Sequence, residues 1–327
     1  MKKILLTGGT GFVGKHLQGE LSLQGIEYFA FSASQYDLTQ SEQAEAVFAA
    51  HSDADVIIHM ASYQAAADFP AKHTAEQFRI NNLIHVNVLE GWRKHIPNAK
   101  FMGIGSSCGY PSTAPVLTED KFMDGEIHGS VYSYAFTKRL LLAGITSYND
   151  QYQLDGTYLI PATMYGEYDD FDVATAHVSG ALIGKFVKAV REGLPDVEIW
   201  GDGSQIREFI YVKDFVAALM HLIPLCERDI VNIGPGRGTT IKQLGEAIRD
   251  ASGFTGHLDF NIDRYVGVDA KVLDTTKLST KYGWQVSTDL EATIQRSVDW
   301  YADGYETLKN KAKFSEASRT GQERSQS

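Results

Sequence analysis

The segment KILLTGGTGFVG, residues 3–14, decides the fold class. Its apolar first half is typical of a buried parallel strand, and glycines at 8, 11 and 14 precede a helix-like stretch. Without side chains, Gly8 and Gly11 let the backbone turn tightly and approach a pyrophosphate, and the following helix offers N–H donors. The spacing is GxxGxxG rather than GxGxxG. The segment therefore indicates a dinucleotide site, with a plain strand–turn–helix as the alternative.

Strands and helices alternate through the first half of the chain. This alternation predicts an α/β fold with a Rossmann-type, doubly wound parallel sheet. The strands expected after the first are 26–31, 55–59, 99–105 and 156–161, and the helices are one starting near 40, 75–95 and 132–150. Capping boxes are predicted at Thr39 with Glu42, Thr240 with Gln243, and Thr288 with Glu291.

The pattern loosens after residue 165. We expect a cofactor domain over 1–165, to which 205–235 returns, and a smaller α/β C-terminal substrate domain over 166–310. Within the second domain, 176–193 is helical and 197–214 holds two short strands around a turn. The polar segment 311–327 lacks apolar periodicity, and this predicts a disordered tail.

Composition restricts the partners. The chain of 327 residues is 43% apolar and 22% charged, typical of a soluble globular protein. Its net charge of -11 argues against nucleic-acid binding, and no apolar run is long enough to span a membrane. Cys108 and Cys226 form neither a disulfide framework nor a metal motif. The N-terminal apolar run is too short for a signal peptide. We expect a cytoplasmic protein without a bound metal.

The end of the second strand bears on the choice of nicotinamide cofactor. NAD enzymes usually carry an acidic residue there to bind the ribose 2′-hydroxyl. This chain has Ser32 and Ser34, whose hydroxyls can donate hydrogen bonds to a 2′-phosphate. The serines favour NADP(H); the alternative is that they only line a polar turn.

A tyrosine and a lysine in YSYAFTKR point to ketone reduction. Tyr134 and Lys138 are four positions apart and share one face of a helix. A free tyrosine has a pKa of about 10, and a nearby ammonium lowers it. Tyr134 would protonate the ketone oxygen, Lys138 would hold the nicotinamide ribose, and Ser106 would hydrogen-bond the same oxygen. Tyr132 has Phe136 in the matching position and lacks this pairing.

At this point the chain resembles the extended short-chain dehydrogenases that act on nucleotide sugars, and among them the GDP-L-fucose synthase family. The resemblance covers about residues 1–305. It rests on seven motifs in the family's order: GSSCGYP (105–111), YSYAFTK (132–138), IPATMYGEYDDF (160–171), AHV (176–178), WGDGSQIREFIYVKD (200–214), VNIGPG (231–236) and LDTTKLSTKYGW (273–284).

The resemblance implies NADPH-dependent 3,5-epimerisation and 4-keto reduction of a nucleotide-linked 4-keto-6-deoxy sugar. Cys108 would be the base and His177 the acid on the opposite face, while Tyr134 or Ser106 stabilises the enolate oxygen. An adjacent imidazolium would favour the Cys108 thiolate. Without the resemblance, a lone cysteine is more often a small buried apolar residue. The family also implies a homodimer joined by the helices near 75–95 and 132–150.

The resemblance also implies two sets of binding residues. The cofactor set is Gly8, Thr10, Gly11, Phe12, Val13, Gly14, Ser32, Ser34, Asp37, Leu38, Ala61, Ile104, Tyr134, Lys138, Pro161, Thr163, Met164 and His177. The substrate set is Ser107, Cys108, Lys185, Trp200, Arg207 and Lys271. Arg207 matches a phosphate-binding arginine whose planar fork suits that ligand. Lys185 stands where the family usually has arginine, and each lysine has a solvated surface charge as its alternative.

Three segments depart from the family pattern: SYQAAADF (62–69), Thr163 in place of asparagine, and YVGVDAK (265–271). They fall in the expected sugar and nucleotide pockets, so the particular sugar and the base stay open. The alternatives are a related GDP-deoxysugar or heptose epimerase/reductase of the GDP-colitose type, and a nucleotide-sugar 4-ketoreductase or 4-epimerase without 3,5-epimerisation. A non-catalytic NADP sensor is a further alternative, against which the intact Tyr134–Lys138 pair argues.

Overall fold

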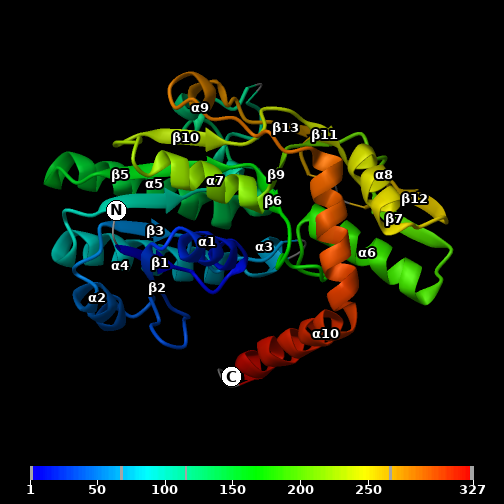
Figure 1. Cartoon of the computed structure of the whole chain (residues 1–327), viewed down its shortest axis with the longest axis horizontal. Coiled ribbons are helices and arrows are strands. Elements are labelled where there is room, and N and C mark those ends of the chain that lie inside the picture. Colours follow the sequence, from blue (N-terminus) through cyan, green and yellow to red (C-terminus); the bar gives the residue numbers. More distant parts are fainter. Residues whose placement is uncertain (1–2, 67–68, 115, 265–266, 325–327) are drawn as a thin grey trace.

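The computed structural model describes residues 3–66, 69–114, 116–264 and 267–324. Its centre is a six-stranded sheet in the order β10-β5-β4-β3-β1-β2, and every pairing is parallel (Figure 1). The strands are β1 (Lys3–Thr7), β2 (Glu27–Ala30), β3 (Val56–His59), β4 (Lys100–Ile104), β5 (Gly156–Pro161) and β10 (Ile230–Ile233). The predicted doubly wound parallel sheet is confirmed.

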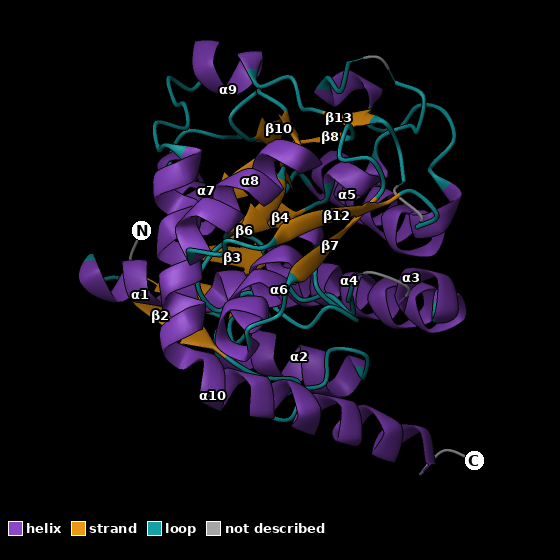
Figure 2. Cartoon of the chain, turned by 90° about the vertical axis from the view of Figure 1, so that its right-hand side faces the viewer, coloured by secondary structure: helices purple, strands orange, loops and turns teal. Residues whose placement is uncertain are grey.

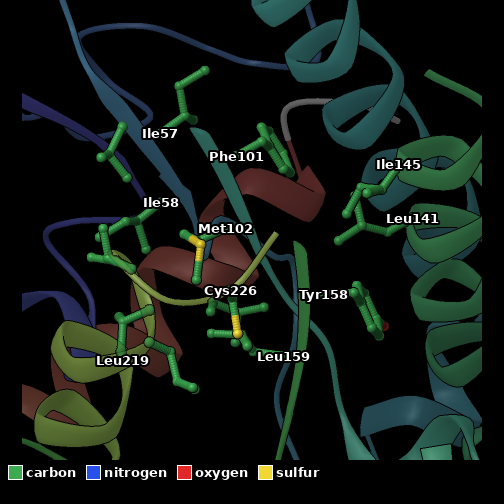
Figure 3. Close-up of a cluster of buried hydrophobic side chains, with 14 of the residues drawn as sticks. Ile57, Ile58, Phe101, Met102, Leu141, Ile145, Tyr158, Leu159, Leu219 and Cys226 are labelled. Carbon is green, nitrogen blue, oxygen red and sulfur yellow. The ribbon is translucent and has the colours of Figure 1, made fainter. Parts of the chain in front are cut away.

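Helices cover both faces of this sheet. One layer contains α2 (Ser41–Ala50), α4 (Thr74–His95) and α5 (Tyr132–Tyr152), while α1 (Phe12–Leu23) packs with α7 (Val212–Leu222). Because both faces are covered, the strands are almost continuously apolar. Figure 3 shows Leu141 and Ile145 of α5 on one side of the sheet strands and Leu219 of α7 on the other.

A second apolar core lies at the other end of the molecule. It is built by α6 (Val178–Glu192), α8 (Ile241–Ser252), α10 (Leu290–Arg324) and the parallel pair β7 (Asp196–Trp200) and β12 (His257–Asn261) (Figure 2). Phe186, Ile199, Leu244 and Ile294 are fully buried there. The shortest helices are α3 (Phe69–Lys72) and α9 (Thr276–Thr280).

Short strands connect the two cores. β6 (Thr163–Tyr165) pairs with β9 (Phe209–Tyr211), and β8 (Ile206–Arg207) lies between β11 (Thr239–Thr240) and β13 (Ala270–Lys271). The segment 197–214 therefore contributes three strands to three sheets, so the prediction of two strands around a turn is wrong. The chain changes direction at Gly201 and Gly203, which have φ of 80° and 79° and so need glycine's freedom.

Only one of the three capping boxes is confirmed, the one at Thr240 and Gln243. At Thr39 the prediction is wrong, because its hydroxyl donates to the Asp37 carboxylate and α2 begins later, at Ser41. At Thr288 it is also wrong. Asp289 accepts from the first turn of α10 in its place, and Thr288 donates to Asp214.

The structure differs from the expected disordered tail. α10 continues as a helix through 311–324, because Lys, Ala, Glu, Gln and Arg are good helix formers that extend a packed helix without apolar periodicity. Figure 1 shows the red end of this helix below the rest of the molecule. Residues 325–327, like 67–68 and 265–266 of two departing segments, lie outside the described residues. No helix in the described ranges is both long and apolar enough to span a membrane.

Candidate active site

The glycine loop between β1 and α1 is closely packed against the chain after β3. A Cβ on Gly8 would lie 2.7 Å from the backbone nitrogen of Ala61, and one on Gly14 would lie 2.1 Å from the carbonyl oxygen of Gly9. Thr10 and Gly11 are exposed, and α1 has no side-chain cap at its N-terminus. The first N–H groups of α1 thus face an uncrowded turn, which fits a diphosphate.

The turn after β2 offers hydroxyls in place of a carboxylate. Ser32 Oγ and Ser34 Oγ are 2.8 Å apart, and Ser32 donates to the amide oxygen of Gln35. Asp37, the acidic residue of this turn, accepts from the backbone and hydroxyl of Thr39 and so is occupied locally. No arginine occurs in 31–40. The residues present fit a 2′-phosphate better than a 2′-hydroxyl.

The other predicted cofactor residues gather at the carboxyl edge of the same sheet, where open α/β sheets bind ligands. Ala61 follows β3, Ile104 ends β4 and Pro161 ends β5. Thr163 and Met164 lie in β6, where the backbone nitrogen of Thr163 donates to the Glu208 carbonyl.

Tyr134 and Ser106 meet at this edge. Ser106 caps a single helical turn, Ser107–Gly109, by accepting from the backbone nitrogen of Cys108 at 3.2 Å. The hydroxyls of Ser106 and Ser62 both act to lower the pKa of the Tyr134 phenol, and Ser62 Oγ itself donates to Asn81 Oδ1 at 3.1 Å. The sequence did not single out Ser62, which lies in a segment that departs from the family pattern. Burial and the charge of a Cys108 thiolate raise the pKa of Tyr134.

Lys138 lies beneath Tyr134. Its Nζ is 5.7 Å from the centroid of the Tyr134 ring and donates to the Ile104 carbonyl at 3.0 Å. Burial lowers the pKa of Lys138 to about 8. In the structure described, desolvation of the phenol is the largest influence on Tyr134 and raises its pKa, whereas the expectation was that the ammonium lowers it.

Cys108 is half-buried and surrounded by cations. Burial raises the pKa of its thiol, but the charge of Lys271, hydrogen bonds with Ser106 and Lys271, and the charge of Arg207 together lower it below the ordinary value. The neighbouring positive charge expected from His177 therefore comes from Lys271.

His177 precedes the first turn of α6 and is exposed to solvent. Its Nε2 lies 2.9 Å from Nε2 of Gln64. Desolvation, and then the charge of Lys271, lower the pKa of His177. Lys271 thus acts on both residues that the sequence pairs as base and acid.

The two cationic residues Arg207 and Lys271 lie on neighbouring strands. Arg207 in β8 and Lys271 in β13 are register partners in a parallel pair, and Thr239 in β11 stands on the other side of Arg207. Residues opposite one another in a sheet project on the same face, so both side chains leave this small sheet on one side.

The predicted nucleotide residues Lys185 and Trp200 surround Glu198. Lys185 Nζ donates to the Glu198 carbonyl at 2.8 Å, and the Trp200 indole donates to its carboxylate at 3.0 Å. Lys185 Nζ lies 5.5 Å and Arg264 Cζ 5.2 Å from the Trp200 ring. Burial opposes ionisation of Glu198, yet donors from Asn261, Trp200 and Arg264 and the charge of Lys185 hold its pKa at about 2. Lys185 is therefore not a solvated surface charge.

A buried pair of histidines, His59 and His85, lies near Lys138, the lysine that also lies beneath Tyr134. The Ala61 backbone donates to Thr7, whose Oγ1 is 2.6 Å from His59 Nδ1, and His59 Nε2 is 2.8 Å from His85 Nδ1. Both rings are buried, and burial together with the charge of Lys138 lowers the pKa of each. The sequence shows both histidines but gives no motif for a role.

Known proteins resemble this chain in sequence and fold. GDP-L-colitose synthase of Yersinia pseudotuberculosis is 30% identical over 308 residues, covering 91% of this chain and 97% of that protein. GDP-L-fucose synthase of Escherichia coli strain K12 is 28% identical over 326 residues, covering 94% and 99%. The NADP-bound GDP-L-fucose synthetase from Naegleria fowleri superposes with a TM-score of 0.85 at 25% identity, covering 94% of each chain.

A family model agrees with these similarities. It matches residues 4–234, from β1 through β10, well over half of the chain. The match includes the glycine loop, the Ser106 turn and the Tyr134–Lys138 pair, all placed at one edge of a parallel sheet. On this match the chain belongs to the NAD dependent epimerase/dehydratase family.

Proposed function

We propose that this enzyme catalyses NADPH-dependent 3,5-epimerisation and 4-keto reduction of a GDP-linked 4-keto-6-deoxy sugar, most simply GDP-4-keto-6-deoxy-D-mannose to GDP-L-fucose. One observation carries the proposal: the Ser106–Cys108 turn and the Tyr134–Lys138 pair meet at the carboxyl edge of the sheet, close enough for the charge of Cys108 to act on the Tyr134 phenol. A thiol, an imidazole and a phenol thus gather within electrostatic range of one another. Epimerisation beside a ketone needs the first two, and reduction of the ketone needs the third.

The cofactor proposed is NADP(H), which supplies or accepts a hydride when bound. The N-terminus of α1 would hold its diphosphate, Ser32 and Ser34 its 2′-phosphate, and Lys138 its nicotinamide ribose. The uncapped helix N-terminus and the paired hydroxyls support this assignment. The NADP bound by the Naegleria fowleri protein agrees with it.

In the epimerisation step, the C4 ketone acidifies the hydrogens on C3 and C5. The Cys108 thiolate removes one of them, and the charge moves to the ketone oxygen as an enolate. The hydroxyls of Tyr134 and Ser106 stabilise that oxygen. His177, which is exposed to solvent, takes up a proton from it and returns that proton to the opposite face, which inverts the centre. The lowered pKa of the Cys108 thiol supports its role as base.

In the reduction step, Tyr134 donates its proton to the C4 oxygen. Its raised pKa keeps the phenol protonated at neutral pH, so the acid is in place before the ketone reacts. Ser106 holds the same oxygen, and Lys138 fixes the ribose beside it.

The second core would bind the nucleotide. Arg207 suits the diphosphate, and the Lys185–Trp200–Arg264 cluster around Glu198 offers both cations and an aromatic face. On this proposal, 1–165 with 205–235 binds the cofactor and 166–310 binds the nucleotide sugar.

We also propose a homodimer through α4 and α5. Both helices expose large apolar side chains: Phe78 and Val86 of α4 are 48% and 49% exposed, and Tyr132 of α5 is 55% exposed. Two free cysteines support a reducing, cytoplasmic location.

A GDP-colitose-type substrate is the second candidate. The relative from Yersinia pseudotuberculosis supports it, and Gln64 and Thr163 depart from the fucose-synthase pattern in the expected sugar pocket. One assay separates the candidates: NADPH loss across GDP-linked 4-keto sugars in deuterated water, with mass analysis of the product. The main proposal requires NADPH oxidation together with deuterium at both C3 and C5. Reduction with deuterium at one carbon or none contradicts it.

A further inference from the structure

The carboxylate of Glu198, in β7 of the second core, accepts hydrogen bonds from four side chains. Its Oε1 accepts from Asn261 Nδ2 at 2.7 Å and from Arg264 Nε at 3.3 Å. Its Oε2 accepts from the Trp200 indole at 3.0 Å and from Lys185 Nζ at 3.5 Å. A carboxylate has about four lone-pair sites, so these donors leave none for a ligand.

This carboxylate arranges two cations around one aromatic ring. Lys185 Nζ and Arg264 Cζ lie 5.5 Å and 5.2 Å from the centroid of the Trp200 ring. The Lys185 side chain is only 17% exposed, and its Nζ also donates to the Glu198 carbonyl at 2.8 Å. An ammonium has three N–H groups, and the contacts of Lys185 within the described residues use two of them. The cluster can therefore offer a donor to a ligand although its carboxylate is saturated.

The charge of Glu198 needs a reason in this place. Although burial opposes its ionisation, donors from Asn261, Trp200 and Arg264 hold its pKa at about 2, so the side chain is negative at neutral pH. A negative charge repels an anionic ligand, and the proposed function brings a nucleoside diphosphate to this core. The contacts supply the reason, because a single carboxylate fixes both the plane of the indole and the place of the ammonium.

We propose that Glu198 is a positioning residue that holds Lys185 and Trp200 in the geometry that binds the nucleoside diphosphate of the substrate, without touching that ligand itself. The inference rests on the proposed function, which brings a GDP-linked sugar to the second core. It goes beyond that function because it gives a favourable role to a carboxylate that simple electrostatics would count against an anion.

The test is the affinity of the full-length protein for GDP, measured by isothermal titration calorimetry. Glu198→Gln keeps the size of the side chain but replaces one acceptor oxygen with an NH₂ donor, so two of the four donors lose their acceptor. The Kd for GDP should rise about tenfold, the scale of one lost charge-assisted hydrogen bond.

Asp259→Asn is the matched control. Asp259 is exposed and lies directly opposite Glu198 in the register of β7 and β12. Its replacement removes the same charge from the same face of the strand pair and should not weaken GDP binding. Repulsion alone predicts the opposite sign for Glu198→Gln, namely tighter binding of GDP.

A double-mutant cycle shows whether Glu198 acts through Lys185. Lys185→Met should weaken GDP binding, and Glu198→Gln should cost less in that variant than in the wild type, because one of the groups it positions is already gone. With the keto sugar as substrate, Glu198→Gln should raise KM and leave kcat nearly unchanged, since no group at the ketone is altered. The affinity for NADPH should not change.

Melting curves show whether each variant is folded, and Glu198→Ala serves if the glutamine variant is not. GDP binding that is unchanged or tighter in the folded variant overturns the inference, as do an equal loss in Asp259→Asn, fully additive losses in the cycle, and a wild-type protein that does not bind GDP. If GDP binding weakens as expected but no keto sugar is turned over, the proposed function fails and this inference stands. If keto sugars are epimerised and reduced while GDP binding is insensitive to Glu198, the proposed function stands and this inference fails.

Discussion

The side chains of Gln64 and His177 are hydrogen-bonded across 113 positions of sequence, with their Nε2 atoms 2.9 Å apart. With the amide nitrogen as donor, His177 Nε2 accepts and the ring proton lies on Nδ1. A neutral ring agrees with the lowered pKa of His177. Gln64 belongs to 62–69, a segment that departs from the family pattern. The residue that hydrogen-bonds with His177, the proposed acid, is therefore one in which this chain differs from that pattern.

Gln64→Leu should therefore slow epimerisation more than reduction. One hydrogen bond to the ring is lost, worth about 1 kcal/mol, or about fivefold in rate. The measurement is the rate of deuterium incorporation at C3 and C5 compared with NADPH oxidation on the same substrate. Gln24→Leu, at the exposed end of α1, is the control and should change neither. Equal slowing of both reactions would show that Gln64 does not act through His177.

Cys108→Ala should separate the two halves of the reaction. Without the base, deuterium incorporation at both carbons should fall by at least about a hundredfold, the usual scale for removing a general base. NADPH oxidation should continue and give a 4-reduced sugar with C3 and C5 uninverted. Cys226→Ala, at the fully buried second cysteine, should keep both activities. Sugar product and exchange are read by mass spectrometry and proton NMR. Undiminished exchange in Cys108→Ala would remove the thiol from the mechanism.

Ser34→Asp should weaken the preference for NADPH. A carboxylate beside a 2′-phosphate is repelled, and we expect the ratio of kcat/KM for NADPH over NADH to fall at least about tenfold. Ser34→Ala tests the loss of the hydroxyl alone and should have a smaller effect. Both variants are assayed on one keto sugar with each cofactor. An unaltered ratio in the aspartate variant would mean that these serines only shape the turn.

The His59–His85 pair should make the fold sensitive to mild acid. Burial and the charge of Lys138 lower the pKa of His59 to about 3, and the pKa of His85 is also well below its ordinary value. Both groups titrate in the unfolded chain near a pKa of about 6.5 but stay neutral when folded, so stability is lost as pH falls below that value. Each contributes a slope of about 1.4 kcal/mol per pH unit.

His85→Leu should flatten this dependence in urea unfolding measured from about pH 7 to about pH 5. The variant should also be less stable at neutral pH by about 1–3 kcal/mol, since the buried His59 Nε2 loses its hydrogen-bond partner. His257→Gln, at an exposed position in β12, is the control and should keep the slope. A slope unchanged in His85→Leu would assign the acid sensitivity to other groups.

The sequence predicts those features that depend on residues close together in the chain. A continuous apolar run predicts a buried strand, and a spacing of four places Tyr134 above Lys138 on one helix face. The parallel sheet and this pair follow directly. The hydrogen bond between Gln64 and His177 and the influence of the Lys271 charge on the pKa of Cys108 join segments far apart in the chain, and no periodicity reports them.

Local rules also fail where a competing partner is close. Thr39 and Thr288 have the spacing of capping residues, but each hydroxyl finds a carboxylate outside the helix. No sequence motif marks Arg264, because its partners, the Glu198 carboxylate and the Trp200 ring, lie more than 60 positions away in β7.

The return of the chain to β10 has a consequence for dissecting this protein. A fragment ending at residue 165 would leave β5 as an unprotected edge and would strip α7 from one side of the sheet. Bare strand edges invite intermolecular pairing, so such a truncation should aggregate instead of yielding a minimal nucleotide-binding module. The two cores are separate, but the sheet of the first is completed by β10 from beyond residue 165, so we expect a swap of sugar specificity to succeed only within the intact chain.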